Sequence, residues 1–165
     1  MEGKKIMNKG TDLSRYFNNI GIRPTFINNK IFGNLYVVEN LRPYTKYPER
    51  FIAVSDKTNK FYFVDCVCCD EKEFVEYIFI EINFGDLYTM SRKNISLYDL
   101  CIKHLNDIYV YLEDWDGIIY EKNSFHELYE DGFIDENDYI GIKSKTFDNA
   151  LLIDMLLEDN IKRIE

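Results

Sequence analysis

Four cysteines are the residues of this chain whose type first suggests chemistry. Three of them, Cys66, Cys68 and Cys69, fall within four positions, and the fourth is Cys101. Structural zinc sites pair cysteines two to four residues apart, whereas on a strand the spacing Cys-x-Cys-Cys sends Cys66 and Cys68 to one face and Cys69 to the other. Cys101 and His104 could complete a zinc site only by meeting them through the fold. Because buried cysteines pack as small apolar side chains and no Cys-x-x-Cys pair is present, the spacing favours reduced, metal-free cysteines.

Two histidines, His104 and His126, are the only side chains that ordinarily titrate near neutral pH. Ser124 and Glu127 lie close to His126 in the sequence, but the members of a catalytic triad meet through the fold and are rarely sequence neighbours. The eight glycines form neither a Gly-x-Ser-x-Gly elbow nor a phosphate-binding loop. We therefore expect no catalytic residue and no cofactor.

An acidic block lies in the second half of the chain. Residues 111–140 hold ten acidic side chains and one lysine, a net charge of −9 that equals the charge of the whole chain. A calcium-binding EF-hand loop needs glycine at its sixth position, but glycine follows Asp114 and Asp131 too early in either frame. We therefore predict no metal site, with a weakly held Ca²⁺ or Mg²⁺ as the alternative.

Large aromatic rings are interleaved with these carboxylates. Aromatic anchors surrounded by charge are typical of protein-binding surfaces, and a solvated acidic face that keeps the protein in solution explains the same pattern. The residues predicted to bind a partner are Glu113, Asp114, Trp115, Asp116, Tyr129, Glu130, Asp131, Phe133, Asp135, Glu136 and Asp138. The partner would be a basic protein surface, since phosphates of nucleic acid need the opposite charge; residues 1–50, with a net charge of +5, stay an open question.

The elements that must position these residues are mainly strands. Aromatics make up 16% of the chain, and alanine occurs only at Ala53 and Ala150, a composition that favours sheet over helix. The patterns predict strands over 35–39, 51–55, 61–67, 74–82, 108–112 and 118–121, and helices over 11–21, 96–105 and 147–157. In the last helix, the expected apolar stripe is Phe147, Leu151, Leu152, Met155 and Leu156.

The predicted fold is α+β, with a mainly antiparallel, strongly curved or barrel-like sheet of six or seven strands and two or three short helices. Residues 1–165 would form a single domain, with an N-terminal helical extension over 1–21 and a C-terminal helix over 146–160. No apolar run is long enough for a membrane span, and the first residues lack a secretory signal. We therefore expect a cytoplasmic protein, in a bacterial cell or a phage-infected host.

Residues 33–105 carry a family resemblance. The segments Gly33-Asn34-Leu35-Tyr36, Pro48-Glu49-Arg50-Phe51, Tyr77-Ile78-Phe79-Ile80 and Ile95-Ser96-Leu97-Tyr98-Asp99-Leu100 resemble an uncharacterised family of small bacterial domains of unknown function. The resemblance implies a fold and supplies no catalytic residues.

The sequence as a whole predicts a non-enzymatic, acidic protein-binding module. One form of such a module is an inhibitor or immunity protein that acts on a nucleic-acid-handling enzyme in a phage or bacterial defence setting, where carboxylates occupy a basic groove in place of phosphates. The alternative is a small enzyme or ligand-binding barrel whose polar residues converge only in the fold. The oligomeric state stays open.

Overall fold

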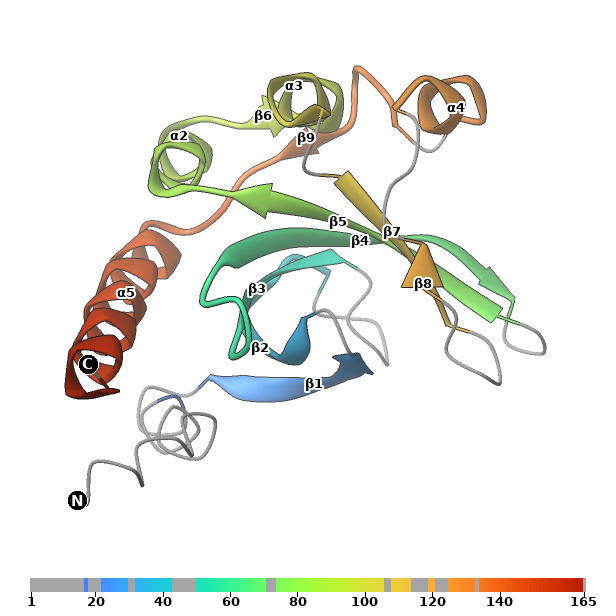
Figure 1. The fold of residues 1–165 in the computed structure, drawn as a ribbon. Coiled ribbons are helices and arrows are strands. Elements are labelled where there is room, and N and C mark those ends of the chain that lie inside the picture. Colours follow the sequence, from blue (N-terminus) through green and yellow to red (C-terminus); the bar gives the residue numbers. More distant parts are fainter. Residues whose placement is uncertain are drawn as a thin grey trace.

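The computed structural model describes residues 17, 22–29, 32–42, 50–70, 74–105, 108–113, 119–120, 125–132 and 134–164. The strands are β1 (Arg23–Asn29), β2 (Gly33–Asn40), β3 (Arg50–Ser55), β4 (Phe61–Asp70), β5 (Phe74–Ile82), β6 (Ile95–Ser96), β7 (Ile108–Glu113), β8 (Ile119–Tyr120) and β9 (Tyr139–Ile140). The helices are α2 (Phe84–Arg92), α3 (Leu97–Lys103), α4 (Phe125–Glu130) and α5 (Ser144–Ile164). Figure 1 shows their arrangement.

Seven strands form one antiparallel sheet in the order β1-β2-β3-β4-β5-β7-β8, and β6 pairs with β9 in a separate ribbon. Within the described residues the sheet is open, with β1 and β8 at its opposite edges (Figure 1). The α+β class and the antiparallel pairing are confirmed, whereas the strongly curved, barrel-like form is wrong. Helices cover one face of this sheet.

The three strands β3, β4 and β5 form the meander that the sequence predicts, with β5 inside the sheet. Side chains alternate between two cores, as the period of a strand requires. One core joins the helices to Ile52, Val54, Phe61, Phe63, Ile78, Ile80 and Ile82. The other holds Phe32, Leu35, Phe51, Ala53, Tyr62, Val64, Tyr77 and Phe79. The described parts of these strands are therefore buried on both faces.

Helix α2 covers the first core and was not predicted. It begins at a capping box in which the Asn83 side chain accepts from the Asp86 backbone N–H at 2.9 Å, and the Asp86 carboxylate accepts from the Asn83 N–H at 2.8 Å. Helix α3 begins where the sequence predicts, because the Ser96 hydroxyl accepts from the Asp99 N–H at 3.0 Å. Leu87, Met90 and Leu100 then pack on the sheet.

Helix α5 contains the predicted C-terminal helix and is longer. Its buried side chains are Thr146, Ala150, Ile153 and Leu157, so the predicted stripe is wrong at three of its five residues, although Phe147 packs partly buried against the first core. Leu151, Leu152 and Met155 are exposed instead. Apolar side chains occupy more than half of the circumference of α5. In the fold, the side that carries Thr146, Ala150, Ile153 and Leu157 faces the core.

Several predictions fall on residues outside the described part of the chain. Of the helix expected over 11–21, only Phe17 is described, and it is helical and buried. The turn between β7 and β8 is also not described. None of the described helices is long and apolar enough to cross a membrane.

Candidate functional site

Helix α4 and the turn after it bring together most of the described residues that the sequence assigned to partner binding. Helix α4 ends at Glu130, and the turn after it contains Gly132, whose φ of +83° lies in the left-handed region that glycine adopts at little cost. The Gly132 N–H donates to the Tyr129 carbonyl at 3.1 Å. The Asp135 side chain then accepts from the Asn137 N–H at 2.8 Å and closes the next turn. The chain therefore folds back on itself over residues 129–138.

This return creates a hollow of about 510 Å³, which we call the acidic hollow. It is lined by Tyr129, Glu130, Gly132, Ile134, Asp135, Glu136 and Asn137. Glu130, Asp135 and Glu136 are exposed, as is the neighbouring Asp131. No lysine or arginine occurs between Lys122 and Lys143, so no lysine or arginine close in the sequence neutralises these carboxylates. The carboxylates of the hollow therefore face solvent, and the hydrogen bonds of the two turns hold the backbone that carries them.

Tyr129 links the aromatic and acidic parts of the hollow. Its hydroxyl donates to Glu136 Oε1 at 2.5 Å, and this hydrogen bond raises the pKa of the phenol because ionisation would remove the donor. The rings of Tyr98, Phe125 and Tyr129 pack on one another with centroids 5.3–5.9 Å apart. Rings in mutual contact leave no space for a cation between them. The exposed face of Tyr129 remains accessible to a partner.

Arg50 of β3 binds the segment over residues 129–138 to the sheet. Its guanidinium donates from Nε and Nη2 to the two oxygens of Asp65, at 3.2 and 3.0 Å. It also donates from Nη1 and Nη2 to the two oxygens of Asp138, at 2.7 and 2.6 Å. In addition, the Asp138 carbonyl accepts from the Leu97 N–H at 2.7 Å. Asp138, which the sequence grouped with the binding residues, thus anchors the segment that carries them.

The electrostatics of this cluster follow from its burial and geometry. Arg50 and Asp65 are buried, with 7% and 4% of their surface exposed. The hydrogen bonds from Arg50 lower the pKa of Asp138, even though partial burial opposes the shift. Burial by itself would lower the pKa of Arg50, but the bonds to Asp138 and Asp65 more than offset this and raise it. Burial raises the pKa of Asp65, and the hydrogen bonds and charge of Arg50 oppose that shift. Arg50 and Asp138 are therefore the pair of this cluster whose charged forms are favoured.

A second buried carboxylate, Asp86, joins α2 to α3. Asp86 Oδ1 accepts from Lys103 Nζ at 2.5 Å, and Asp86 Oδ2 lies 2.8 Å from His104 Nε2. Burial would raise the pKa of Asp86, but Lys103, the Asn83 N–H and His104 together lower it. Each oxygen of the carboxylate has a partner, so this cluster is structural. His126, the other histidine, is exposed and pairs with Glu130 one helical turn later at 2.9 Å.

The described cysteines do not meet. Cys66 packs beside the second core and Cys101 is buried in the first, so the sheet lies between them. Burial raises the pKa of the Cys101 thiol to about 12, which keeps it protonated. Among the described residues, no three His, Cys, Asp or Glu side chains cluster as metal ligands. The side chains of Cys68 and Cys69 lie outside the described part.

The remaining predicted residues cannot be placed in the hollow. The backbone of Glu113 ends β7, but its side chain is not described, and Asp114, Trp115, Asp116 and Phe133 lie outside the described residues.

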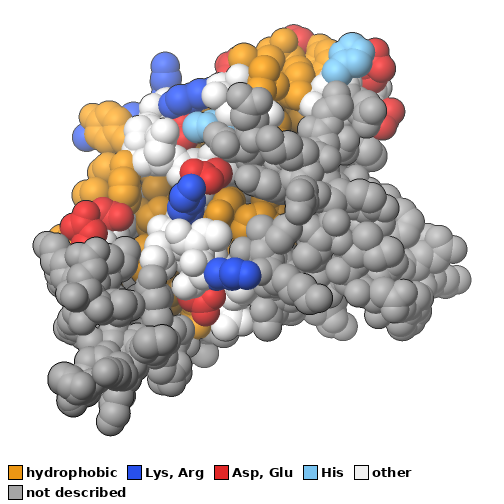
Figure 2. All heavy atoms as spheres, viewed as in Figure 1, with side chains coloured by type: hydrophobic (Ala, Val, Ile, Leu, Met, Phe, Trp, Pro, Cys, Tyr) orange, Lys and Arg blue, Asp and Glu red, His pale blue; other side chains and the backbone are white. Residues whose placement is uncertain are grey.

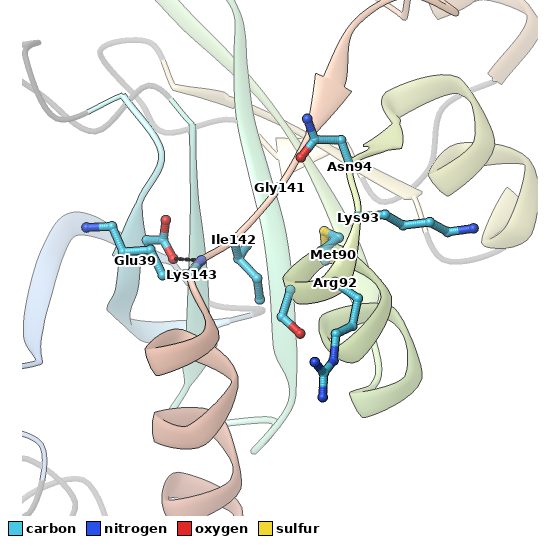
Figure 3. A pocket seen from close by; sticks show the side chains of 9 residues that line it. Glu39, Met90, Arg92, Lys93, Asn94, Gly141, Ile142 and Lys143 are labelled. Carbon is cyan, nitrogen blue, oxygen red and sulfur yellow. Dashed lines mark hydrogen bonds between the residues drawn. The ribbon is translucent and has the colours of Figure 1, made fainter.

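A hollow of about 300 Å³ lies where α2 ends and α5 begins (Figure 3). Its polar centre is Glu39, whose Oε1 accepts from the Lys143 N–H at 3.0 Å and from the Thr146 hydroxyl. Lys93 extends away from Glu39 (Figure 3). The carboxylate serves as a cap for the first turn of α5, and the hollow is no candidate site.

Comparison with known proteins found no similar protein. The chain matches no protein-family model, no curated protein and no solved structure.

Proposed function

We propose that this protein is a non-enzymatic binding module that receives a basic segment of a partner protein in the acidic hollow. The observation that carries the proposal is the arrangement of Glu130, Asp135 and Glu136 around one hollow beside the exposed ring of Tyr129. Figure 2 shows acidic side chains on the outer edge of α4, next to hydrophobic side chains over α3.

The charge of the hollow defines the partner. Carboxylates that repel one another raise the free energy of the unbound protein, and a cationic partner relieves that repulsion. Their field also steers a basic segment into the encounter and speeds association at low salt. An arginine of the partner could stack on Tyr129 and pair with Glu136 together, which combines a cation–π contact with a charge-assisted hydrogen bond.

The anchoring by Arg50 supports a preformed site. Because Asp138 is held at both carboxylate oxygens and at its carbonyl, the segment before it loses little further freedom when a partner binds. A site that is already ordered avoids part of the entropic cost of association. A nucleic-acid-handling enzyme, with a basic groove built for phosphates, is the kind of partner that fits this charge.

The test begins with copurification from the native host, followed by mass spectrometry of the bound proteins. The test variant, Asp135→Lys with Glu136→Lys, reverses two carboxylates of the hollow. The control, Asp148→Lys with Asp99→Lys, reverses two exposed carboxylates on α5 and α3 and changes the net charge equally. We expect a basic protein that the wild type and the control retain and the test variant loses. Equal retention by all three proteins would contradict the proposal.

A further inference from the structure

An exposed apolar surface lies on the outer side of α5. Its exposed side chains are Leu151, Leu152 and Met155 of α5 and Tyr88 of α2, the partly buried Phe147 lies beside Tyr88, and we call this surface the α5 face. Tyr88 and Phe147 contact edge to face, with ring centroids 5.6 Å apart. Figure 2 shows hydrophobic side chains along the outer edge of α2 and α5. Contiguous exposed apolar side chains of this kind mark interaction surfaces.

Charges of opposite sign lie at the two ends of this face. Arg92 lies at the Tyr88 end, with its guanidinium 5.2 Å from the centre of the Tyr88 ring. Asp154 and Glu158 lie toward the other end of the helix. At about 100° per residue, positions 147, 151, 154 and 158 follow one ridge of α5. The two carboxylates therefore share an edge of the face with Phe147, which contacts α2.

The acidic end of the face is unfavourable in the isolated chain. Asp154 and Glu158 are one turn apart, and like charges at this spacing destabilise a helix. Partial burial and the charge of Glu158 raise the pKa of Asp154. The ion pairs found among the described residues do not involve either carboxylate or Arg92. Both ends of the face therefore offer charges that a second molecule could pair.

We propose that the α5 face binds a second copy of this chain in an antiparallel dimer, in which Arg92 of each copy pairs with Glu158 and Asp154 of the other. A twofold axis beside Leu151 and Leu152 sets the two leucine pairs against each other. The same axis reverses the helix direction and keeps each edge of the face on its own side, as an isologous interface requires. The basic end of one copy then lies at the acidic end of the other.

The size of the face sets the strength of the dimer. From Phe147 to Glu158 the helix advances about 17 Å, at about 1.5 Å per residue. One helix face of that length, widened by Tyr88, is smaller than the roughly 800 Å² that each partner buries in a typical stable complex. We therefore expect a dimer that dissociates on dilution. This inference does not depend on the proposed function, because α4 and the acidic hollow take no part in it.

The test is sedimentation velocity over a roughly hundredfold range of protein concentration. We expect the wild type to shift from monomer to dimer as the concentration rises. Leu151→Lys places two like charges at the axis and should leave a monomer throughout. Ile102→Lys is the matched control on α3, because Ile102 and Leu151 are 43% and 42% exposed, and it should dimerise as the wild type does. If Leu151→Lys fails to fold by circular dichroism, Met155→Lys, at 61% exposure, replaces it.

A charge swap tests the antiparallel arrangement. Arg92→Glu and Glu158→Arg should each weaken the dimer at least about tenfold, and the double variant should recover most of the loss. A wild type that stays monomeric at every concentration would overturn the proposal. So would a Leu151→Lys variant that dimerises as well as the Ile102→Lys control, or a double swap no better than the single variants.

Discussion

The most informative single change is Arg50→Met, which removes the guanidinium that joins the sheet to the acidic segment over residues 129–138. Methionine has nearly the length of the arginine stem, so the change removes the charge and the donors while leaving most of the packing. Asp65 then keeps a carboxylate with only 6% of its side chain exposed and loses both donors on Arg50. Breaking a buried ion pair from one side costs about 3–5 kcal/mol, and we expect a loss of that size in the free energy of unfolding at pH 7.

The size of the loss should depend on pH and on the partner residue. Without Arg50, burial raises the pKa of Asp65 in the folded protein further above its pKa in the unfolded chain. The variant therefore loses stability as pH rises from the unfolded pKa of Asp65 to its folded pKa. Arg50→Met should therefore be closer to the wild type at pH 5 than at pH 7. Asp138→Asn should cost only about 1 kcal/mol, because Asp138 is partly exposed and solvent compensates for the lost charge.

Urea unfolding followed by circular dichroism measures each difference. The double variant Arg50→Met with Asp65→Leu replaces the buried pair by apolar side chains of similar volume, and it should recover much of the loss. A loss below about 1 kcal/mol in Arg50→Met, or a double variant no more stable than the single one, would refute this account of the cluster.

Three further predictions concern the sheet, the turn and the response to acid. Ile80→Asp places an unpaired charge in the core on β5 and should prevent folding; a cooperative unfolding transition in this variant would contradict the central position of the strand. Gly132→Ala should cost about 1 kcal/mol in unfolding free energy, because alanine is strained at a φ of +83°, and an unchanged urea midpoint would contradict this. The pKa of Asp138 lies below its unfolded value of about 3.9, so its contribution is present above pH 4 and disappears as pH falls through the folded value; the stability difference between wild type and Asp138→Asn should shrink in that range, and a difference that grows with acid would contradict the assignment.

Most strands of the large sheet were predictable because their signals are local, whereas β1, β6 and β9 were not predicted. The run of β-branched and aromatic residues over 74–82 and the polar turn between residues 55 and 61 indicate the strands and their hairpin without reference to distant residues. Helix α2 was missed because its residues, Phe84-Gly85-Asp86-Leu87-Tyr88, include a glycine and show no clear periodicity. The Asn83–Asp86 capping pair was the signal that could have indicated its start.

Tertiary contacts determine which side of α5 is buried, and they also determine that Arg50 holds Asp138 at the end of the acidic segment. Apolar side chains surround so much of α5 that periodicity alone could not select the buried side. Arg50 and Asp138 are 88 residues apart, so no spacing rule connects them. Asp65 within the apolar run of β4 was the signal that could have indicated a buried cationic partner, but the sequence does not say which one.

The association rate of the copurified basic partner tests the central claim most directly. It should be measured at about 0.1 M and about 1 M salt, between which the Debye length falls from about 10 Å to about 3 Å. We predict that the wild type associates at least about tenfold more slowly at high salt, and that Asp135→Lys with Glu136→Lys is slow at both concentrations. Equal rates for the wild type and this variant at low salt, with both proteins folded, would contradict the claim that the acidic hollow receives the partner.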